Sequence, residues 1–172
     1  MNPLFNYTLK LADDTLIFGQ RLGELCGQGP YLEEDIALTN IALDYLGQSN
    51  NFYKYAAQIQ DLGKTEDDLA FLRLEKEYLN CQLSELPNGD YANTIMKVYF
   101  FSVYQKILYT ELMKSSDVQL SGIAEKSLKE VKYHYTHTTP WIKMFAGGTE
   151  ESKTCAKTAD ENHWEYTHGM SA

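Results

Sequence analysis

The sequence predicts an all-α protein, an up-and-down bundle of about five to six helices. Three observations support this fold class. Apolar residues recur at helical spacing along several long segments, and glycine- or proline-containing breakers separate those segments. The chain also holds only four prolines, which lie at or near expected helix ends. Its 172 residues, 44% of them hydrophobic, suffice for one core, so we expect one domain.

The first half of the chain should form three helices. The first is expected from Leu4 to Cys26, because the run 27–30 (Gly-Gln-Gly-Pro) that follows ends a helix. The second is expected over 33–60, and its apolar residues surround most of its circumference, as in a central helix. Thr65 with Asp68 three positions later forms a capping-box pattern. This pattern predicts a third helix that runs to about Leu83.

The second half should form two long helices and a tail. The breaker over 86–90 precedes a fourth helix over about 91–114, and the oxygens of 115–117 can cap a fifth over 118–145. We expect the bundle to occupy 1–148, with 149–172 as a helical or mobile tail of the same domain. Apolar residues of the tail do not gather on one helical face. The tail should therefore pack on something outside this chain or stay mobile.

The composition excludes several classes of protein. A net charge of −9 leaves no basic stripe for nucleic acid, but an acidic surface suits a basic patch on another subunit. The three scattered cysteines, Cys26, Cys81 and Cys155, fit a reducing compartment. Neither a secretory signal nor a membrane-spanning run is visible. We therefore expect a cytoplasmic protein that binds neither nucleic acid nor membrane, and its partner could be another protein subunit or a second copy of itself.

One narrow stripe of the second helix is polar. It consists of Asn40, Asp44, Gly47, Gln48 and Asn51, and we call it the polar stripe. Two interpretations compete. The stripe could be the solvent face, or it could face the bundle interior, where polar groups must satisfy one another. Solvent faces usually carry lysine and glutamate, whereas these side chains are mostly amides, and periodicity alone leaves both interpretations open.

The fifth helix carries a second candidate site. Glu130, His134 and His137 share one face, and a carboxylate with two imidazoles could ligate a metal. The alternative is a surface or interface patch in which Tyr133 and Trp141 pack.

A carboxylate di-iron bundle would demand more than this face. It takes one glutamate from each of two helices and a Glu-x-x-His pair from each of the other two. The second helix offers Asp44 with Gly47 at the histidine position, and the fifth offers Glu130 with Tyr133, although His134 follows. The remaining positions fall near Asp13 or Asp14 and at Ser102. The layout matches but the ligand set does not, so we predict no catalytic, cofactor-binding or metal-binding residue.

Four blocks of the chain resemble a known protein family. They are YTLKLADDTLIFGQRLGELCGQGPYLEEDIALTNIALDYLGQSNNFYKYAA, DLAFLRLEKEY, LPNGDYANTI and IAEKSLKEVKYHY. They are similar to the C-type subunits of bacterial phenylacetyl-CoA epoxidases, the ring 1,2-epoxidases, along essentially the whole chain. The family usually continues with further helices, so this chain is expected to be truncated at its C-terminus relative to it.

The resemblance implies a ferritin-like bundle and a non-catalytic role. In this family the di-iron centre and the acyl-CoA belong to the catalytic, A-type subunit, with which the C-type subunit pairs as a structural partner. The missing histidines at Gly47 and Tyr133 agree with that role. The polar stripe, including Asn40, Gln48 and Asn51, would then line an interior built like an iron site but without its histidines.

Two other functions stay open at this point. The chain could be a di-iron carboxylate oxygenase in its own right, with Asp13 or Asp14, Asp44, Glu130 and His134 as ligands. It could also be a helical interaction module unrelated to epoxidation.

Overall fold

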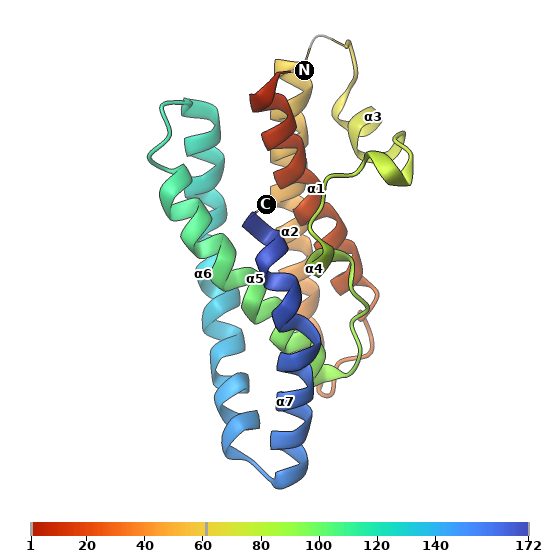
Figure 1. The fold of residues 1–172 in the computed structure, drawn as a ribbon, viewed down its shortest axis with the longest axis vertical. Coiled ribbons are helices and arrows are strands. Elements are labelled where there is room, and N and C mark those ends of the chain that lie inside the picture. The colour runs from red at the N-terminus through yellow and green to blue at the C-terminus, as the bar shows by residue number, and fades with distance from the viewer. Residues whose placement is uncertain (1, 61, 172) are drawn as a thin grey trace.

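Four long helices form the body of the molecule. The computed structural model describes residues 2–60 and 62–171, and these residues contain no strand. The long helices are α1 (Pro3–Gly23), α2 (Leu32–Ile59), α5 (Tyr91–Leu112) and α6 (Val118–Gly147). Figure 1 shows α2 and α6 close to the vertical and α5 inclined to them. The all-α prediction is confirmed, and none of the described helices is long and apolar enough to cross a membrane.

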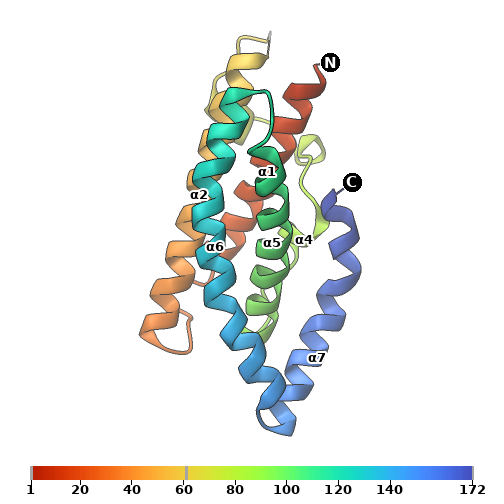
Figure 2. The ribbon, with the colours of Figure 1, turned by 90° about the vertical axis from the view of Figure 1, so that its left-hand side faces the viewer.

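The order of the four helices gives the bundle its topology. Short turns join α1 to α2 and α5 to α6, so the members of each pair run antiparallel. Residues near the start of α2 meet residues near the end of α6, as in the hydrogen bond from Trp141 to Glu34, and Figure 2 shows these two helices side by side. Helices α2 and α5 therefore run in the same direction. One long crossover, residues 60–90, connects them, as in ferritin-like bundles.

The predicted helix starts rest on side-chain caps. Asp90 accepts from the Asn93 amide and Asp117 from the Leu120 amide, which satisfies amides that have no partner inside the helix. Gly89 supplies the left-handed backbone conformation, with a φ of 65°, that the turn before α5 requires. One detail of the sequence prediction is wrong, since Pro140 lies inside α6 rather than at a helix end.

The long third helix predicted to reach Leu83 is wrong. The crossover instead holds α3 (Glu66–Phe71), the 3-10 turn η1 (Glu75–Glu77) and α4 (Gln82–Glu85). The capping box of Thr65 and Asp68 does form and starts α3. Helix α3 ends at Phe71, and farther along the crossover the backbone amides of Leu79 and Cys81 donate to aspartates of α1, over 2.8 and 2.6 Å. A continuous helix would have given those amides to its own carbonyls.

The tail forms a helix that packs on this chain. Helix α7 (Glu150–Trp164) and the 3-10 turn η2 (Glu165–Ser171) run back along α5 and α6, and Figures 1 and 2 show the α6–α7 hairpin extending past the other helices. Ala159 and His163 are buried there, and Ala159 packs in a cluster with Ala92 and Met96 of α5. The tail is helical, and the prediction that it packs on something outside this chain is wrong, because its contact residues are too small and too few to produce an apolar stripe.

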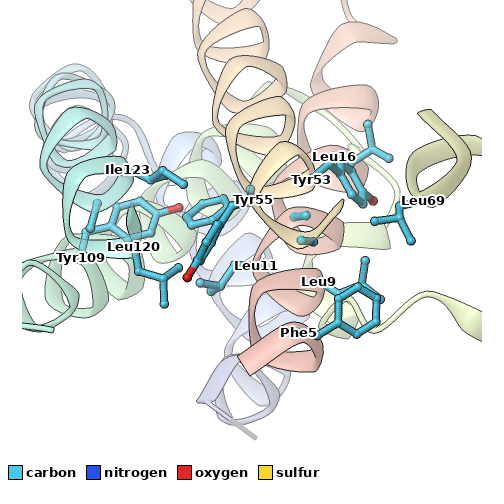
Figure 3. Packing of buried hydrophobic residues seen from close by; sticks show 14 of the residues in the cluster. Phe5, Leu9, Leu11, Leu16, Tyr53, Tyr55, Leu69, Tyr109, Leu120 and Ile123 are labelled. Carbon is cyan, nitrogen blue, oxygen red and sulfur yellow. The ribbon is translucent and has the colours of Figure 1, made fainter. Parts of the chain in front are cut away.

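The core runs the length of the bundle. At one end Tyr109 of α5 lies beside Ile123 and Leu120 of α6, while Leu69 of α3 points toward Tyr53 and Leu16 (Figure 3). At the other end Phe18 of α1 stacks on Phe101 of α5 at 4.2 Å between ring centroids. Such aromatic pairs favour close helix packing beyond the apolar area they bury. Between the two ends lies a polar layer.

Candidate functional site

The structure divides the polar stripe of α2 between interior and surface. Gln48 is buried, with 1% of its surface exposed, and Asp44 and Asn51 lie at the seam with partial exposure. Asn40 and Gly47 are exposed, so the prediction that they line the interior is wrong. Helix α2 rests on α1 on one side and on α6 on the other. Its third face, which carries Asn40 and Gly47, remains open.

Gln48 is the centre of a buried hydrogen-bond network that joins three helices. Its Nε2 donates to Oε2 of Glu130 on α6 over 2.9 Å. Its Oε1 accepts from the hydroxyl of Tyr109 on α5 over 3.1 Å, and that hydroxyl accepts from Gln105 Nε2 over 3.1 Å. One amide thus satisfies a carboxylate and a phenol at once, which is the condition for enclosing such groups without a large desolvation cost.

Burial changes the acidity of the groups in this network. It raises the pKa of the Glu130 carboxyl, an effect that the hydrogen bond from Gln48 partly opposes. It also raises the pKa of the Tyr109 hydroxyl well above its ordinary value, and neighbouring tyrosines and carboxylates add to this. Both shifts favour the neutral form. Tyr109 therefore supplies no anionic ligand near neutral pH.

Asp44 and His134 form a second pair across the α2–α6 seam. Their Oδ2 and Nε2 atoms lie 2.9 Å apart. The imidazole is fully buried and packs against the ring of Tyr45 at 4.7 Å between centroids. The Nδ1 of His134 has no hydrogen-bond partner in the described part of the chain. With Nε2–H given to Asp44, Nδ1 is left as an enclosed acceptor.

Asp13 and Asp14 of α1 hold the crossover. Asp13 accepts from the Tyr53 hydroxyl over 2.5 Å and from both terminal nitrogens of Arg73. Asp14 accepts from the Cys81 amide over 2.6 Å and from Lys10 over 3.2 Å. All four carboxylate oxygens are thus occupied by donors from α1, α2 and the crossover.

The other three predicted di-iron positions hold no ligand. Ser102 is buried on α5 and donates its hydroxyl to the carbonyl of Val98 over 2.7 Å, with Tyr45 Oη at 3.5 Å. Gly47 has open space where a side chain would start, and half of the Tyr133 surface is exposed. Neither position points a donor into the polar layer.

These side chains do not fit a di-iron centre. Among residues 2–60 and 62–171, no three histidine, cysteine or acidic side chains converge closely enough to hold a metal ion. One carboxylate oxygen of Asp44 already meets His134, and one of Glu130 accepts from Gln48. Nδ1 of His134 and one oxygen of each carboxylate are left over, and this set lacks the second imidazole and the further carboxylates that two irons require.

One polar cluster was missed by the sequence analysis. Glu34 of α2 accepts from the Tyr91 hydroxyl over 2.6 Å and from Trp141 Nε1 over 3.1 Å. His137 Nε2 lies 3.0 Å from the same carboxylate, at ion-pair distance but without hydrogen-bond geometry. The face of His137 was identified from sequence, but Glu34 sits between Glu33 and Asp35. Only the turn of the helix directs Glu34, rather than its two acidic neighbours, toward α5 and α6.

The chain is similar to a known protein family along its whole length. The family described as Phenylacetic acid catabolic protein matches residues 1–172. The chain belongs to this family. A curated relative, the C-type subunit of the 1,2-phenylacetyl-CoA epoxidase of Escherichia coli (strain K12), is 44% identical over 167 residues, which make up 97% of this chain and 67% of the relative. In this member of the Phenylacetic acid catabolic protein family, the interior between α2, α5 and α6 is thus a hydrogen-bonded polar layer.

Proposed function

We propose that this chain is the non-catalytic structural subunit of a multicomponent phenylacetyl-CoA epoxidase of aerobic phenylacetate degradation. In this proposal it pairs with the di-iron catalytic subunit of the epoxidase in the cytoplasm. Family membership and the similarity to the C-type subunit of the Escherichia coli enzyme support the assignment. The di-iron cofactor and the acyl-CoA substrate would then belong to the catalytic subunit.

The observation that carries the proposal is the network around Gln48. A di-iron bundle needs several free carboxylate oxygens and an imidazole for each iron. Here an amide donates to Glu130, Tyr109 donates to that amide, and His134 is engaged with Asp44. These groups stabilise the bundle through hydrogen bonds that link α2, α5 and α6. A bundle of this kind suits the role of a scaffold.

Co-expression with the catalytic subunit tests the proposal. We expect a stable complex in size-exclusion chromatography with light scattering, and iron that copurifies with the catalytic subunit only. Replacing Asp44 with alanine should leave the iron content of the complex and its epoxidase turnover unchanged. Stoichiometric iron in the isolated chain, or lack of a complex at micromolar concentrations, would refute the assignment. The former result would favour an oxygenase that uses Asp44, Glu130 and His134.

A further inference from the structure

The crossover exposes an unusual run of large apolar side chains. Phe71, Leu72 and Leu74 are 61%, 76% and 75% exposed, and they follow one another at the end of α3. Figure 1 shows α3 and the segment after it standing off the four long helices, beside α1. Single exposed apolar residues are common, but a contiguous group marks an interaction surface.

This run is held firmly in place. Arg73, which lies between the exposed leucines, points inward to Asp13, and its Nε and Nη1 donate to the carbonyls of Leu69 and Glu77 over 2.6 and 2.8 Å. The ring of Tyr78 lies 4.2 Å from the guanidinium carbon. The exposed side chains therefore start from a backbone that is already ordered. Preorganisation of this kind lowers the conformational entropy lost on binding.

A groove of about 290 Å³ adjoins the run. Its apolar wall includes Leu46, Tyr53, Ala70 and Phe71. Glu66 and Asp67 of the first turn of α3 lie along its edge. An apolar side chain with a cation beside it would match both parts of the groove.

The charges around the groove indicate which kind of protein surface would bind there. Residues 62–79 contain five carboxylates and three cations, one of which, Arg73, is committed to Asp13. Glu66, Asp67 and Glu75 form no ion pair within the described part of the chain. The whole sequence carries a net charge of −9. An acidic edge around an apolar centre complements a surface on which lysine or arginine flanks an apolar pocket.

We propose that Glu66, Asp67, Phe71, Leu72 and Leu74, the crossover patch, dock the catalytic subunit at a basic-edged apolar surface of that subunit. This inference rests on the proposed function, which it deepens by assigning a face to the interaction. The leucines and Phe71 supply the apolar anchors, and the two carboxylates steer and orient the approach.

Binding of the purified catalytic subunit from the same organism tests this face. The dissociation constant is measured for the wild-type chain, for Leu72→Ser/Leu74→Ser and for Glu66→Lys/Asp67→Lys. We expect the leucine variant to raise Kd at least about tenfold. The charge reversal should raise it similarly at low ionic strength and much less at about 0.5 M salt, where charges are screened. Circular dichroism and thermal unfolding verify that each variant is folded.

Two matched controls isolate the patch. Leu32→Ser/Leu43→Ser removes exposed leucines from α2. Glu150→Lys/Glu151→Lys reverses two carboxylates in the first turn of α7, directly after its N-cap Thr149. Glu66 and Asp67 occupy the same positions in α3, directly after its N-cap Thr65. Both controls should bind like the wild type.

The outcomes separate the two proposals. Wild-type binding that the crossover variants leave unchanged, or that the controls weaken equally, overturns the crossover patch and leaves the subunit role intact. Lack of wild-type binding overturns both proposals. If the isolated chain forms dimers that the crossover variants disrupt, the occupant is a second copy and the docking proposal is wrong.

Discussion

Arg73 and Asp13 form an ion pair almost closed to water, with 5% and 0% of their side chains exposed. The sequence pattern placed Asp13 among possible metal positions and Arg73 on an ordinary helix. Neither residue type reveals its partner, because the two lie 60 positions apart. An enclosed pair like this fixes one arrangement of the crossover, since either charge alone would be buried without compensation.

We predict that Arg73→Met destabilises the protein by about 3–5 kcal/mol, because it leaves the Asp13 carboxylate buried without its cation. Urea unfolding followed by circular dichroism measures the change. Lys114→Met is the control. It removes an ion pair with Glu111 that is about two-thirds exposed on both sides, and it should cost less than about 1 kcal/mol. Equal effects of the two variants would contradict a structural role for the pair.

Lys97 is a buried ammonium on α5 that contacts oxygens but no carboxylate. It donates to the Leu86 carbonyl over 2.9 Å and to Asn88 Oδ1 over 2.8 Å. Burial, with a smaller contribution from the charge of Arg21, lowers the pKa of Lys97 from 10.5 to about 8. The amine holds the breaker before α5 to the helix, and the folded state favours its neutral form at alkaline pH.

The second prediction follows from that pKa. Between pH 8 and 10.5 the unfolded chain binds more protons at Lys97 than the folded one, so stability rises with pH across this window. The full contribution is about 3 kcal/mol. Below pH 8 both states carry the charge and the contribution is absent. Urea unfolding from pH 7 to 10.5 should show the rise in the wild type and its loss in Lys97→Met. Parallel profiles would contradict the assignment.

At the scale of elements, the predicted helix starts agree with the structure where a capping side chain sets them. Asp90, Asp117 and Thr65 cap α5, α6 and α3, and a cap is a contact between residues three positions apart. The third helix failed where partners lie far apart in the sequence. Leu79 and Cys81 have no local feature that indicates their amides will bind aspartates of α1. Such tertiary contacts override helical periodicity.

Gln48 links α2, α5 and α6, and its replacement with glutamate should weaken the contact between these helices. In Gln48→Glu two carboxylates would face each other where an amide now donates to Glu130 over 2.9 Å. One of the two must take up a proton, so the pKa of the pair is raised above that in the unfolded chain. We expect a loss of about 2–4 kcal/mol near neutral pH that shrinks as the pH falls toward 5. Stability measured against pH checks this.

The control for that variant is Gln58→Glu, at an exposed position of the same helix. It should cost at most about 1 kcal/mol above pH 5, the effect of an exposed negative charge near a helix C-terminus, because solvent screens the added charge. A pH-independent loss in Gln48→Glu would show that packing, rather than charge, accounts for the effect.

Helix α7 is held to α5 by a small apolar contact, and a charged side chain placed in that contact should detach the helix. Ala159 is fully buried in the cluster with Ala92 and Met96 of α5. Ala159→Lys would place an ammonium in that contact, and we expect loss of hydrogen-exchange protection over 150–171 while α1, α2, α5 and α6 keep theirs. Thr158→Lys, at an exposed neighbouring position, should leave protection unchanged. Global unfolding in Ala159→Lys would show that α7 is integral to the bundle.

At the scale of the molecule, the fold class was predictable because helical periodicity, breakers and caps agree along most of the chain. The arrangement of the polar layer was not. A helical wheel gives the angle between Gln48 and Asn40 on α2, but it does not say which neighbour covers each face. That information lies in how α1 and α6 pack against α2, which leaves Asn40 at the surface and encloses Gln48.

Metal removal should leave the isolated chain unaffected. Because Asp44 and Glu130 already have partners, we expect the thermal midpoint to be the same with a chelator, with ferrous iron and with zinc. A ligand that binds the native state would raise the midpoint as its concentration increases. Such a rise, abolished by His134→Ala, would contradict the prediction and assign His134 a metal-binding role.

The contacts of the crossover with α1 also determine the order in which the molecule opens. Because Asp13 and Asp14 meet Arg73, Leu79 and Cys81 across 60 to 67 positions, loop closure delays these contacts behind the α1–α2 hairpin during folding. In a partial opening the same segment can detach while the long helices persist. The amide hydrogens of Leu79 and Cys81, each bonded to a carboxylate, thus exchange with solvent only when the segment lifts. Their exchange rates report the fraction of molecules whose crossover patch is formed.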